Sequence, residues 1–305
     1  MTNSPPNLVH IFTTSQTALP VRYPHPRKPQ LLVPALIHRC LHSSLDQTPP
    51  SLSVNKGDQG GKVIVIPNEL DIPKYDLLES DVELTVKLHL VTSPSLSIVK
   101  EALHFLSIYK GLDRIETLLI GFRGIDYKGK KTAASEMFGC GTEGLESGNG
   151  SEDVPEQLAQ TVLRLWKEIH QDAEIKAKEI NKMGTLYLPL GLLERLEEPR
   201  PTVNSLDTPD CHSLPKQYSA FAEENGIELW AGGGGEGSDP LPSSELHNLL
   251  QEFSPSSEWL NNVGELVPLR ADGLKYERDS SSVTVRWVLG YTLVSKMRNV
   301  VKDKG

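Results

Sequence analysis

The stretch LTVKLHLVT at residues 84–92 decides the fold together with IETLLIGF at residues 115–122. Both are short and rich in apolar and β-branched residues, which predicts two strands. The segment between them carries apolar residues at the spacing of one helix face, namely Leu96, Val99, Leu103 and Leu106. Ser95 is placed to cap this helix and Gly111 to end it. Strand, helix and strand within about 40 residues indicate a parallel crossover.

The same alternation continues downstream. The pattern predicts a helix from Pro155, a strand at Met183–Leu188, a short helix at Leu190–Leu196, a strand at Val203–Leu206, a helix near Pro215 and a strand at Ile227–Ala231. Strands that alternate with helices are typical of an α/β protein with a parallel sheet.

The predicted domain organisation has two parts. Residues 1–60 are punctuated by Pro and Ser and are predicted to form a poorly ordered N-terminal segment, with an edge strand at Asn7–Thr13 and a short helix at Leu31–Leu41. Residues 61–305 are predicted to form the main domain. Polar, Gly-rich or charged insertions near 128–153, 232–242 and 270–282 are predicted to be mobile, because they can bury little apolar surface.

Composition and charge restrict the function classes. The chain has 305 residues, with 31 Lys and Arg against 40 Asp and Glu, a net charge of −9. This excess of acidic residues disfavours nucleic acid as a partner. An apolar run long enough to span a membrane is absent from the sequence, and the N-terminus does not resemble a secretory signal. We therefore expect a cytoplasmic protein without membrane association.

Motifs for cofactors and metals are weak. Gly232, Gly234 and Gly237 spell G-x-G-x-x-G, but the helical pattern resumes only near Ser243, so a flexible loop is the better interpretation. The spacing of the nine His and three Cys residues fits no zinc site. G-x-S-x-G and Walker A sequences are absent from the sequence. We expect no cofactor and no metal.

One stretch resembles a known superfamily. Leu112–Ile120 (LDRIETLLI) is similar to the L-D-x-I-D-L-x-L-I segment of aldo-keto reductases. Further matches follow in the same order at Met183–Thr185, Pro201–Asn204 (PTVN) and Phe221–Leu229 (FAEENGIEL). The resemblance runs from about Leu84 to Leu289 and implies a (β/α)8 TIM barrel of aldo-keto reductase type.

The catalytic groups of that superfamily do not carry over. Ser93 stands where its lysine would be and Gly121 where its histidine would be. The residues that hold and stack on the nicotinamide correspond to Leu186, Tyr187 and Gly232. Carbonyl reduction needs a tuned proton donor and a nicotinamide pocket. We therefore predict a protein without catalytic residues. The alternative interpretation is an NADPH-dependent reductase, and a third interpretation is a sensor that binds a nucleotide weakly.

The C-terminus resembles the regulatory (modifier) subunits of glutamate–cysteine ligase, an inactive branch of the superfamily. Their W-x-L-x-Y-x-x-x-V-K-x-R-x-x-x-K-x-K-G pattern is matched from Trp287 to Gly305, except at Ser295. The resemblance implies a heterodimer with the catalytic subunit, better use of glutamate and ATP, and relief of glutathione inhibition. The candidate partner-binding residues are Trp287, Tyr291, Lys296, Arg298 and Lys302. The alternative interpretation of this segment is that it forms the last helix and strand of the barrel, with its end exposed to solvent.

Overall fold

A computed structural model describes residues 8–13, 32–56, 61–75, 82–127, 154–208, 214–231, 237–253, 283–295 and 300–304, with only the backbone at Ser295 and in the last range. Its strands are β1 (Leu8–Ile11), β2 (Ser53–Lys56), β3 (Lys62–Ile66), β4 (Val82–Leu90), β5 (Arg114–Phe122), β6 (Glu179–Leu186), β7 (Val203–Leu206), β8 (Glu228–Ala231), β9 (Trp287–Ser295) and β10 (Val300–Lys304). Its helices are α1 (Leu32–Leu45), η2 (Glu69–Asp71), α2 (Leu96–Lys110), α4 (Glu156–Gln171), α5 (Ala173–Lys176), α6 (Leu190–Leu193), α7 (Lys216–Glu224) and α8 (Ser243–Phe253).

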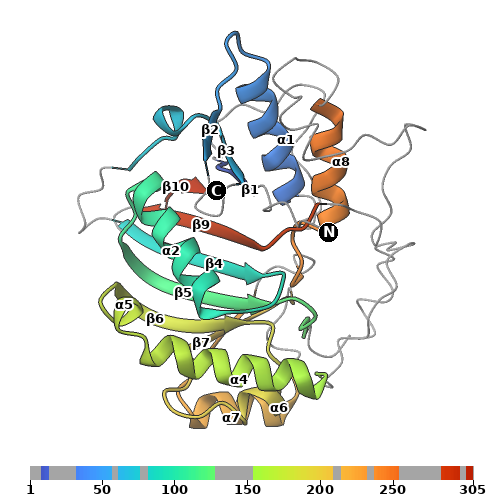
Figure 1. The fold of residues 1–305 in the computed structure, drawn as a ribbon. Coiled ribbons are helices and arrows are strands. Elements are labelled where there is room, and N and C mark those ends of the chain that lie inside the picture. The colour runs from blue at the N-terminus through green and yellow to red at the C-terminus, as the bar shows by residue number, and fades with distance from the viewer. Residues whose placement is uncertain are drawn as a thin grey trace.

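The larger sheet has the order β10-β9-β4-β5-β6-β7-β8 (Figure 1). Strands β4 to β8 are parallel to one another in consecutive order. This confirms the α/β class with a parallel sheet, and each of these strands lies where the sequence pattern predicts one. Helices α2, α4, α6 and α7 contribute to one apolar core on one face of this sheet, because their apolar residues recur at helical spacing.

Helix α2 begins and ends near the predicted residues. Gly111 ends it in the left-handed conformation with φ 69°, which glycine adopts at little cost. Ser95 occupies the N-cap position, but its side chain makes no capping hydrogen bond. Its hydroxyl instead contacts the Ser97 hydroxyl at 3.0 Å, so the prediction that Ser95 caps the helix is wrong in this respect.

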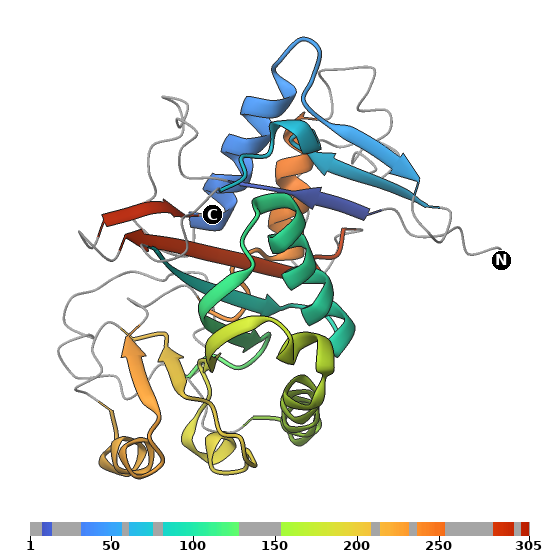
Figure 2. The same ribbon diagram turned by 90° about the vertical axis from the view of Figure 1, so that its left-hand side faces the viewer.

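A second layer is built from the N-terminal part of the chain and α8. Strands β1, β3 and β2 form a small sheet in that order, so β1 is an edge strand, as the sequence predicts for this segment. Helices α1 and α8 pack against this sheet and against Val91 and Val285 (Figures 1 and 2). Part of the predicted N-terminal segment is therefore folded, while the domain boundary at residue 60 stays a prediction.

The C-terminal strands differ from the expectation. Strand β9 pairs antiparallel with β4 over its whole length, from Val82↔Ser295 to Leu90↔Trp287, and β10 folds back onto β9. In place of a final helix and strand, the described residues show a hairpin. The sheet is open among these residues, with β10 at one edge and β8 at the other. The expected closure into a barrel is therefore not part of the described structure.

Part of the predicted insertion 232–242 is anchored. The Ser238 backbone N–H and hydroxyl both donate to the Asp126 carboxylate after β5, and the Ser238 hydroxyl accepts from the Gly124 N–H at 3.0 Å. Arg123 pairs with Asp239 at 3.2 Å. The insertions predicted near 128–153 and 270–282 lie outside the described residues, as do Gly232 and Gly234 of the glycine motif.

We predict that Gly184 in β6 is required by the close approach of β7. A Cβ at this position would lie 2.4 Å from the Val203 carbonyl oxygen and 2.8 Å from Leu119 Cδ2. Gly184→Ala should therefore lower the free energy of unfolding by about 3 kcal/mol, measured by urea denaturation. Gly191→Ala in α6 is the matched control, since its Cβ would meet nothing within 4 Å. Equal stability of the two variants would contradict the described packing of β6 on β7.

Candidate functional site

The carboxyl ends of β4 and β5 hold Ser93 and Gly121, where the resemblance stated from the sequence would place the reductase lysine and histidine. Ser93 follows β4 and is exposed. Gly121 is the penultimate residue of β5, and a Cβ there would lie 3.0 Å from Leu186 Cδ1 and 3.4 Å from His89 Nδ1. Leu186 and His89 are both buried. The space into which a side chain at position 121 would project is therefore already filled.

The next two positions at this end of the sheet are also part of the packing. Leu186 and Tyr187, where the same resemblance would place the nicotinamide-binding serine and asparagine, are buried. Tyr187 has a φ of 62°, a strained conformation for a residue with a side chain. Its N–H donates to the Ser205 carbonyl at 2.8 Å, and its ring centroid lies 6.1 Å from that of His89. Backbone bonding to β7 thus holds the strained residue in place.

A buried hydrogen-bond network occupies the neighbouring region. The Asn204 side chain accepts from the Thr185 hydroxyl at 2.9 Å and donates to the Leu188 carbonyl at 3.0 Å and the Tyr218 hydroxyl at 2.6 Å. Tyr127 stacks on Tyr218 with centroids 5.3 Å apart, and burial raises the pKa of Tyr218. Because each of these polar groups is satisfied by another protein group, the network stabilises the loops after β5, β6 and β7.

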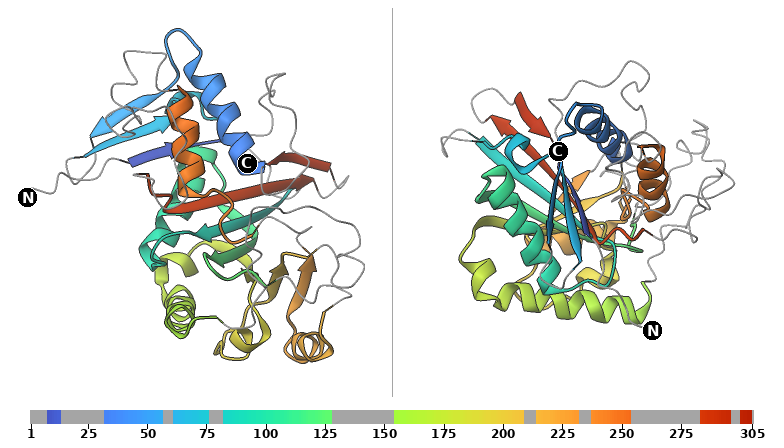
Figure 3. Two further views of the ribbon diagram at one scale, coloured as in Figure 1. Left: turned by 90° about the vertical axis from the view of Figure 1, so that its right-hand side faces the viewer. Right: turned by 45° about the horizontal axis from the view of Figure 1, so that its top comes forward.

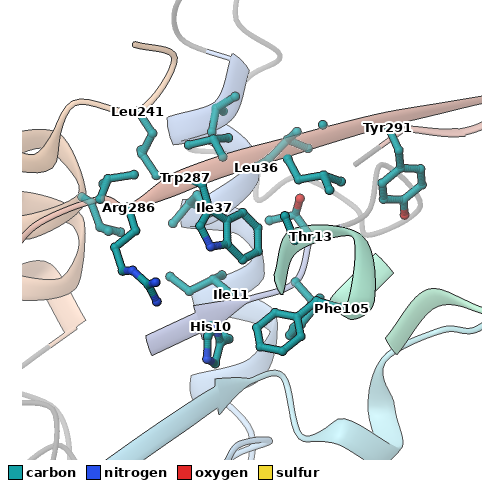
Figure 4. Close-up of a pocket in the computed structure, with 18 of the residues that line it drawn as sticks. His10, Ile11, Thr13, Leu36, Ile37, Phe105, Leu241, Arg286, Trp287 and Tyr291 are labelled. Atoms are coloured by element: carbon teal, nitrogen blue, oxygen red, sulfur yellow. The ribbon is translucent and has the colours of Figure 1, made fainter. Parts of the chain in front are cut away.

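A cavity of about 520 Å³ lies at the other side of the molecule, where the larger sheet meets the N-terminal layer. It is lined by β1, β9 and the segment before β9, by Thr85 and Lys87 of β4, and by residues of α1, α2 and α8 around them (Figure 4). This volume lies within the roughly 300–1,000 Å³ range of ligand pockets. We call this cavity the slot.

The slot follows the edges of two strands. Every residue from Leu8 to Thr13 and from Val283 to Thr292 lines it. Successive side chains of a strand point to opposite faces, so a cavity beside one face would touch only alternate residues. Contact with consecutive residues places the slot along the edges of β1 and β9, both of which line it. Figures 2 and 3 show the two strands from opposite sides of the molecule.

Aromatic rings line part of the slot. The His10 ring meets Phe105 edge-on at 4.6 Å, and Phe105 lies 6.0 Å from Trp287. Burial and the neighbouring Arg286 lower the pKa of His10 to about 4, so this imidazole is neutral at pH 7. The Arg286 guanidinium forms two contacts with the Glu101 carboxylate, at 3.0 and 3.1 Å. That pair joins the start of β9 to α2.

Lys110 is the unusual charged group of the slot. Its side chain is 3% exposed, and its Nζ donates to the Thr13 carbonyl at 3.3 Å and lies 5.7 Å from the centre of the Tyr291 ring. The described residues that line the slot include no Asp or Glu. Burial therefore lowers the pKa of Lys110 to about 8, and the group is still mainly charged at pH 7. A buried cation without a carboxylate partner is costly.

Two of the five predicted partner-binding residues meet in this slot. Trp287 and Tyr291 both line it. Lys296 and Arg298 lie outside the described residues, and Lys302 is described only as backbone in β10. Sequence reasoning missed Lys110, His10 and Phe105. A signal for Lys110 was present, because it follows Leu103 and Leu106 at helical spacing and so falls on the buried face of α2.

We predict that Lys110→Met stabilises the isolated protein by about 1–3 kcal/mol at pH 7. The methionine keeps the apolar stem and removes the buried charge. The pKa of Lys110 is about 8 in the folded protein, against 10.5 ordinarily. The increase in the free energy of unfolding should therefore be complete below pH 8, where the buried lysine is charged. It should decrease between pH 8 and 10.5, where the folded protein has already lost this proton. Urea denaturation across this pH range measures it.

Lys100→Met on the same helix is the control. Lys100 contacts Asp172 and Glu174, and the hydrogen bond that it donates to Glu174 raises its pKa, so loss of the lysine should slightly destabilise the protein. A destabilised Lys110→Met variant would show that Lys110 has a stabilising partner in the isolated chain.

Metal-binding clusters and membrane-spanning helices are both absent from the described residues. These residues contain no group of three or more His, Cys, Asp and Glu side chains placed to hold a metal ion. Within the same residues, none of the helices combines the length and apolar character needed to cross a membrane.

Comparison with known proteins finds distant relatives. The chain is 27% identical over 146 residues to the "Glutamate--cysteine ligase regulatory subunit" of Rattus norvegicus, a stretch that covers 46% of this chain and 43% of the rat protein. The proteins of the same name from Mus musculus and Homo sapiens are 26% identical over equal coverage. The match spans less than half of each relative's length. No family model and no solved structure matches the chain.

Proposed function

We propose that the chain is a non-catalytic regulatory subunit that binds the catalytic subunit of glutamate–cysteine ligase in the cytoplasm and raises its activity. The observation that carries this proposal is the similarity to three proteins named as regulatory subunits of that ligase. The resemblance of residues Trp287 to Gly305 to the C-terminal pattern of such regulatory subunits also supports it.

The geometry at the carboxyl ends of β4 and β5 favours a non-catalytic role. A reductase needs side chains that reach the carbonyl and a space for the nicotinamide. Here Leu186 and His89 fill the space beside Gly121, and Tyr187 is buried. We further propose that β4 to β8 derive from an aldo-keto reductase barrel, since they are parallel, consecutive and joined by helices in the order that such a barrel requires.

A regulatory subunit of this kind acts through differential binding. It shifts the catalytic chain toward its active conformation only by binding that conformation more tightly than the inactive one. Better use of glutamate and ATP and weaker inhibition by glutathione then have one cause, which is a larger population of the active conformation.

We predict that the chain co-purifies with the ligase catalytic chain from the same organism and changes its kinetics. A coupling free energy of 1–3 kcal/mol corresponds to about a 5–150-fold change in affinity. We therefore expect at least about a fivefold lower glutamate KM or higher glutathione inhibition constant when the two chains are mixed. Serum albumin at equal concentration is the control. Unchanged substrate and glutathione dependence at saturating regulatory chain would overturn the proposal.

The reductase alternative has a direct test. Fluorescence titration with NADPH and turnover of an aldehyde measure nucleotide binding and hydride transfer by the isolated chain. Saturable binding together with turnover would replace the regulatory proposal by an enzymatic one, and binding alone would favour a nucleotide sensor.

A further inference from the structure

The charged side chains of the slot have one sign. Among the described residues that line it, every charged side chain is basic, namely Lys87, Lys110 and Arg286. The whole chain, by contrast, has a net charge of −9. Walls of low dielectric concentrate the field of the charges beside them, so a cavity lined in this way attracts anions. The slot therefore selects a negatively charged ligand on a protein that is acidic as a whole.

Lys110 is the cation that this ligand would contact. The Arg286 guanidinium is balanced by its pair with Glu101. The described contacts of the Lys110 Nζ are both uncharged, the Thr13 carbonyl oxygen at 3.3 Å and the Tyr291 ring with its centre 5.7 Å away. Burial lowers the pKa of Lys110 to about 8, whereas an adjacent carboxylate would raise it. The described neighbours of Lys110 thus leave its charge unbalanced.

A lysine at this position costs stability. Leu103 and Leu106 precede Lys110 on the buried face of α2, where an apolar side chain would carry no charge into the core. A buried charge without a partner of opposite sign destabilises the folded state. Residues that break a packing rule at such a cost are expected at functional sites. An anion bound beside the Lys110 Nζ would offset this cost.

The remainder of the slot suits a hydrocarbon chain. In the close-up, Thr13 and Tyr291, the two contacts of Lys110, lie on one side and Arg286 lies on the other (Figure 4). Trp287 of β9 and Ile37 of α1 lie between them in this view. A ligand with its charged end at Lys110 would therefore extend along apolar side chains. The cavity volume of about 520 Å³ is that of a small-molecule site.

We propose that the slot binds a free medium-chain fatty acid, whose carboxylate accepts a hydrogen bond from the Lys110 Nζ and whose hydrocarbon chain lies between α1 and β9. A carboxylate fits this end better than a phosphate, because the Thr13 carbonyl oxygen beside Nζ would repel a second negative charge. This ligand site belongs to the isolated chain and does not rest on the proposed function.

A series of ligands tests the two ends of the site. Isothermal titration calorimetry of the full chain should show saturable binding of decanoate below the concentration at which it forms micelles. Each buried methylene group raises affinity about fourfold, so decanoate should bind at least about tenfold more tightly than hexanoate. Decanol keeps the chain without the charge and should bind about tenfold more weakly than decanoate. Decylammonium, which reverses the charge, should show no saturable binding.

Two lysine variants on one helix test the charged contact. Lys110→Met should weaken decanoate binding at least about tenfold, the effect of losing one charge-assisted hydrogen bond. Its affinity for decanol should change less than about twofold, because decanol makes no such bond. Lys100→Met, which removes a charge from the surface of α2, is the matched control and should bind decanoate like the wild type. Since Lys110→Met is expected to be more stable than the wild type, unfolding would not explain its weaker binding.

Fluorescence locates the hydrocarbon chain. A bromine atom quenches an indole that it contacts, so decanoate with a terminal bromine atom should quench Trp287 when it fills the slot. At saturating ligand, Trp287→Phe should remove most of this quenching. Trp230→Phe is the matched control, because Trp230 belongs to β8 at the far edge of the larger sheet and should not contribute to the signal.

Several outcomes would overturn the proposal. Absence of saturable decanoate binding would remove the site, and equal affinities of the wild type and Lys110→Met for decanoate would place the ligand elsewhere. Equal affinities for decanoate and decanol would make the slot a general apolar cavity. Binding to vesicles of anionic phospholipid without binding of decanoate would assign the basic residues to a membrane surface. Failure to form a ligase complex would remove the proposed function and leave this site intact.

Discussion

The antiparallel pairing of β9 with β4 is the constraint on which the remaining structure depends. It runs over nine residue pairs and inserts a strand from the C-terminal region beside the first strand of the parallel series. One face of β9 then completes the core under α2, with Tyr291 and Leu293 buried there. Its opposite face carries Val288 into the core of the N-terminal layer. The pairing of β9 with β4 therefore places β9 in contact with both apolar cores and leaves the slot between these cores.

The parallel part of the fold could be predicted from the sequence because its signals are local. Strands β4, β5 and β7 are short apolar or alternating runs bounded by turn residues, and Gly111 marks the end of α2. The place of β9 could not be predicted in this way. The run from Trp287 to Val294 is apolar on both faces, a pattern that indicates burial but names no neighbouring strand. The open order of the described strands could not be predicted for the same reason.

The residues of the candidate site also differ in whether they could be identified from the sequence. Trp287 and Tyr291 could be identified from the C-terminal motif, and the structure places both on the slot. Lys110 was not identified, because a lysine at the end of a helix is usually solvated and close to the helix dipole. Its burial arises from residues distant in sequence, Thr13 and Tyr291. The helical spacing places Lys110 on the buried face of α2, but its neighbours in the slot depend on tertiary contacts, which residue patterns within one segment do not encode.

The bond between Arg286 and Glu101 joins residues 185 positions apart in the chain. During synthesis, β4 and α2 leave the ribosome long before β9 does, so the β4 edge remains open to other chains throughout that interval. Contacts of such long sequence separation also form slowly. The protein should therefore depend on chaperones that cover the open edge of β4 until β9 has been made, and its yield in cells should be sensitive to their supply.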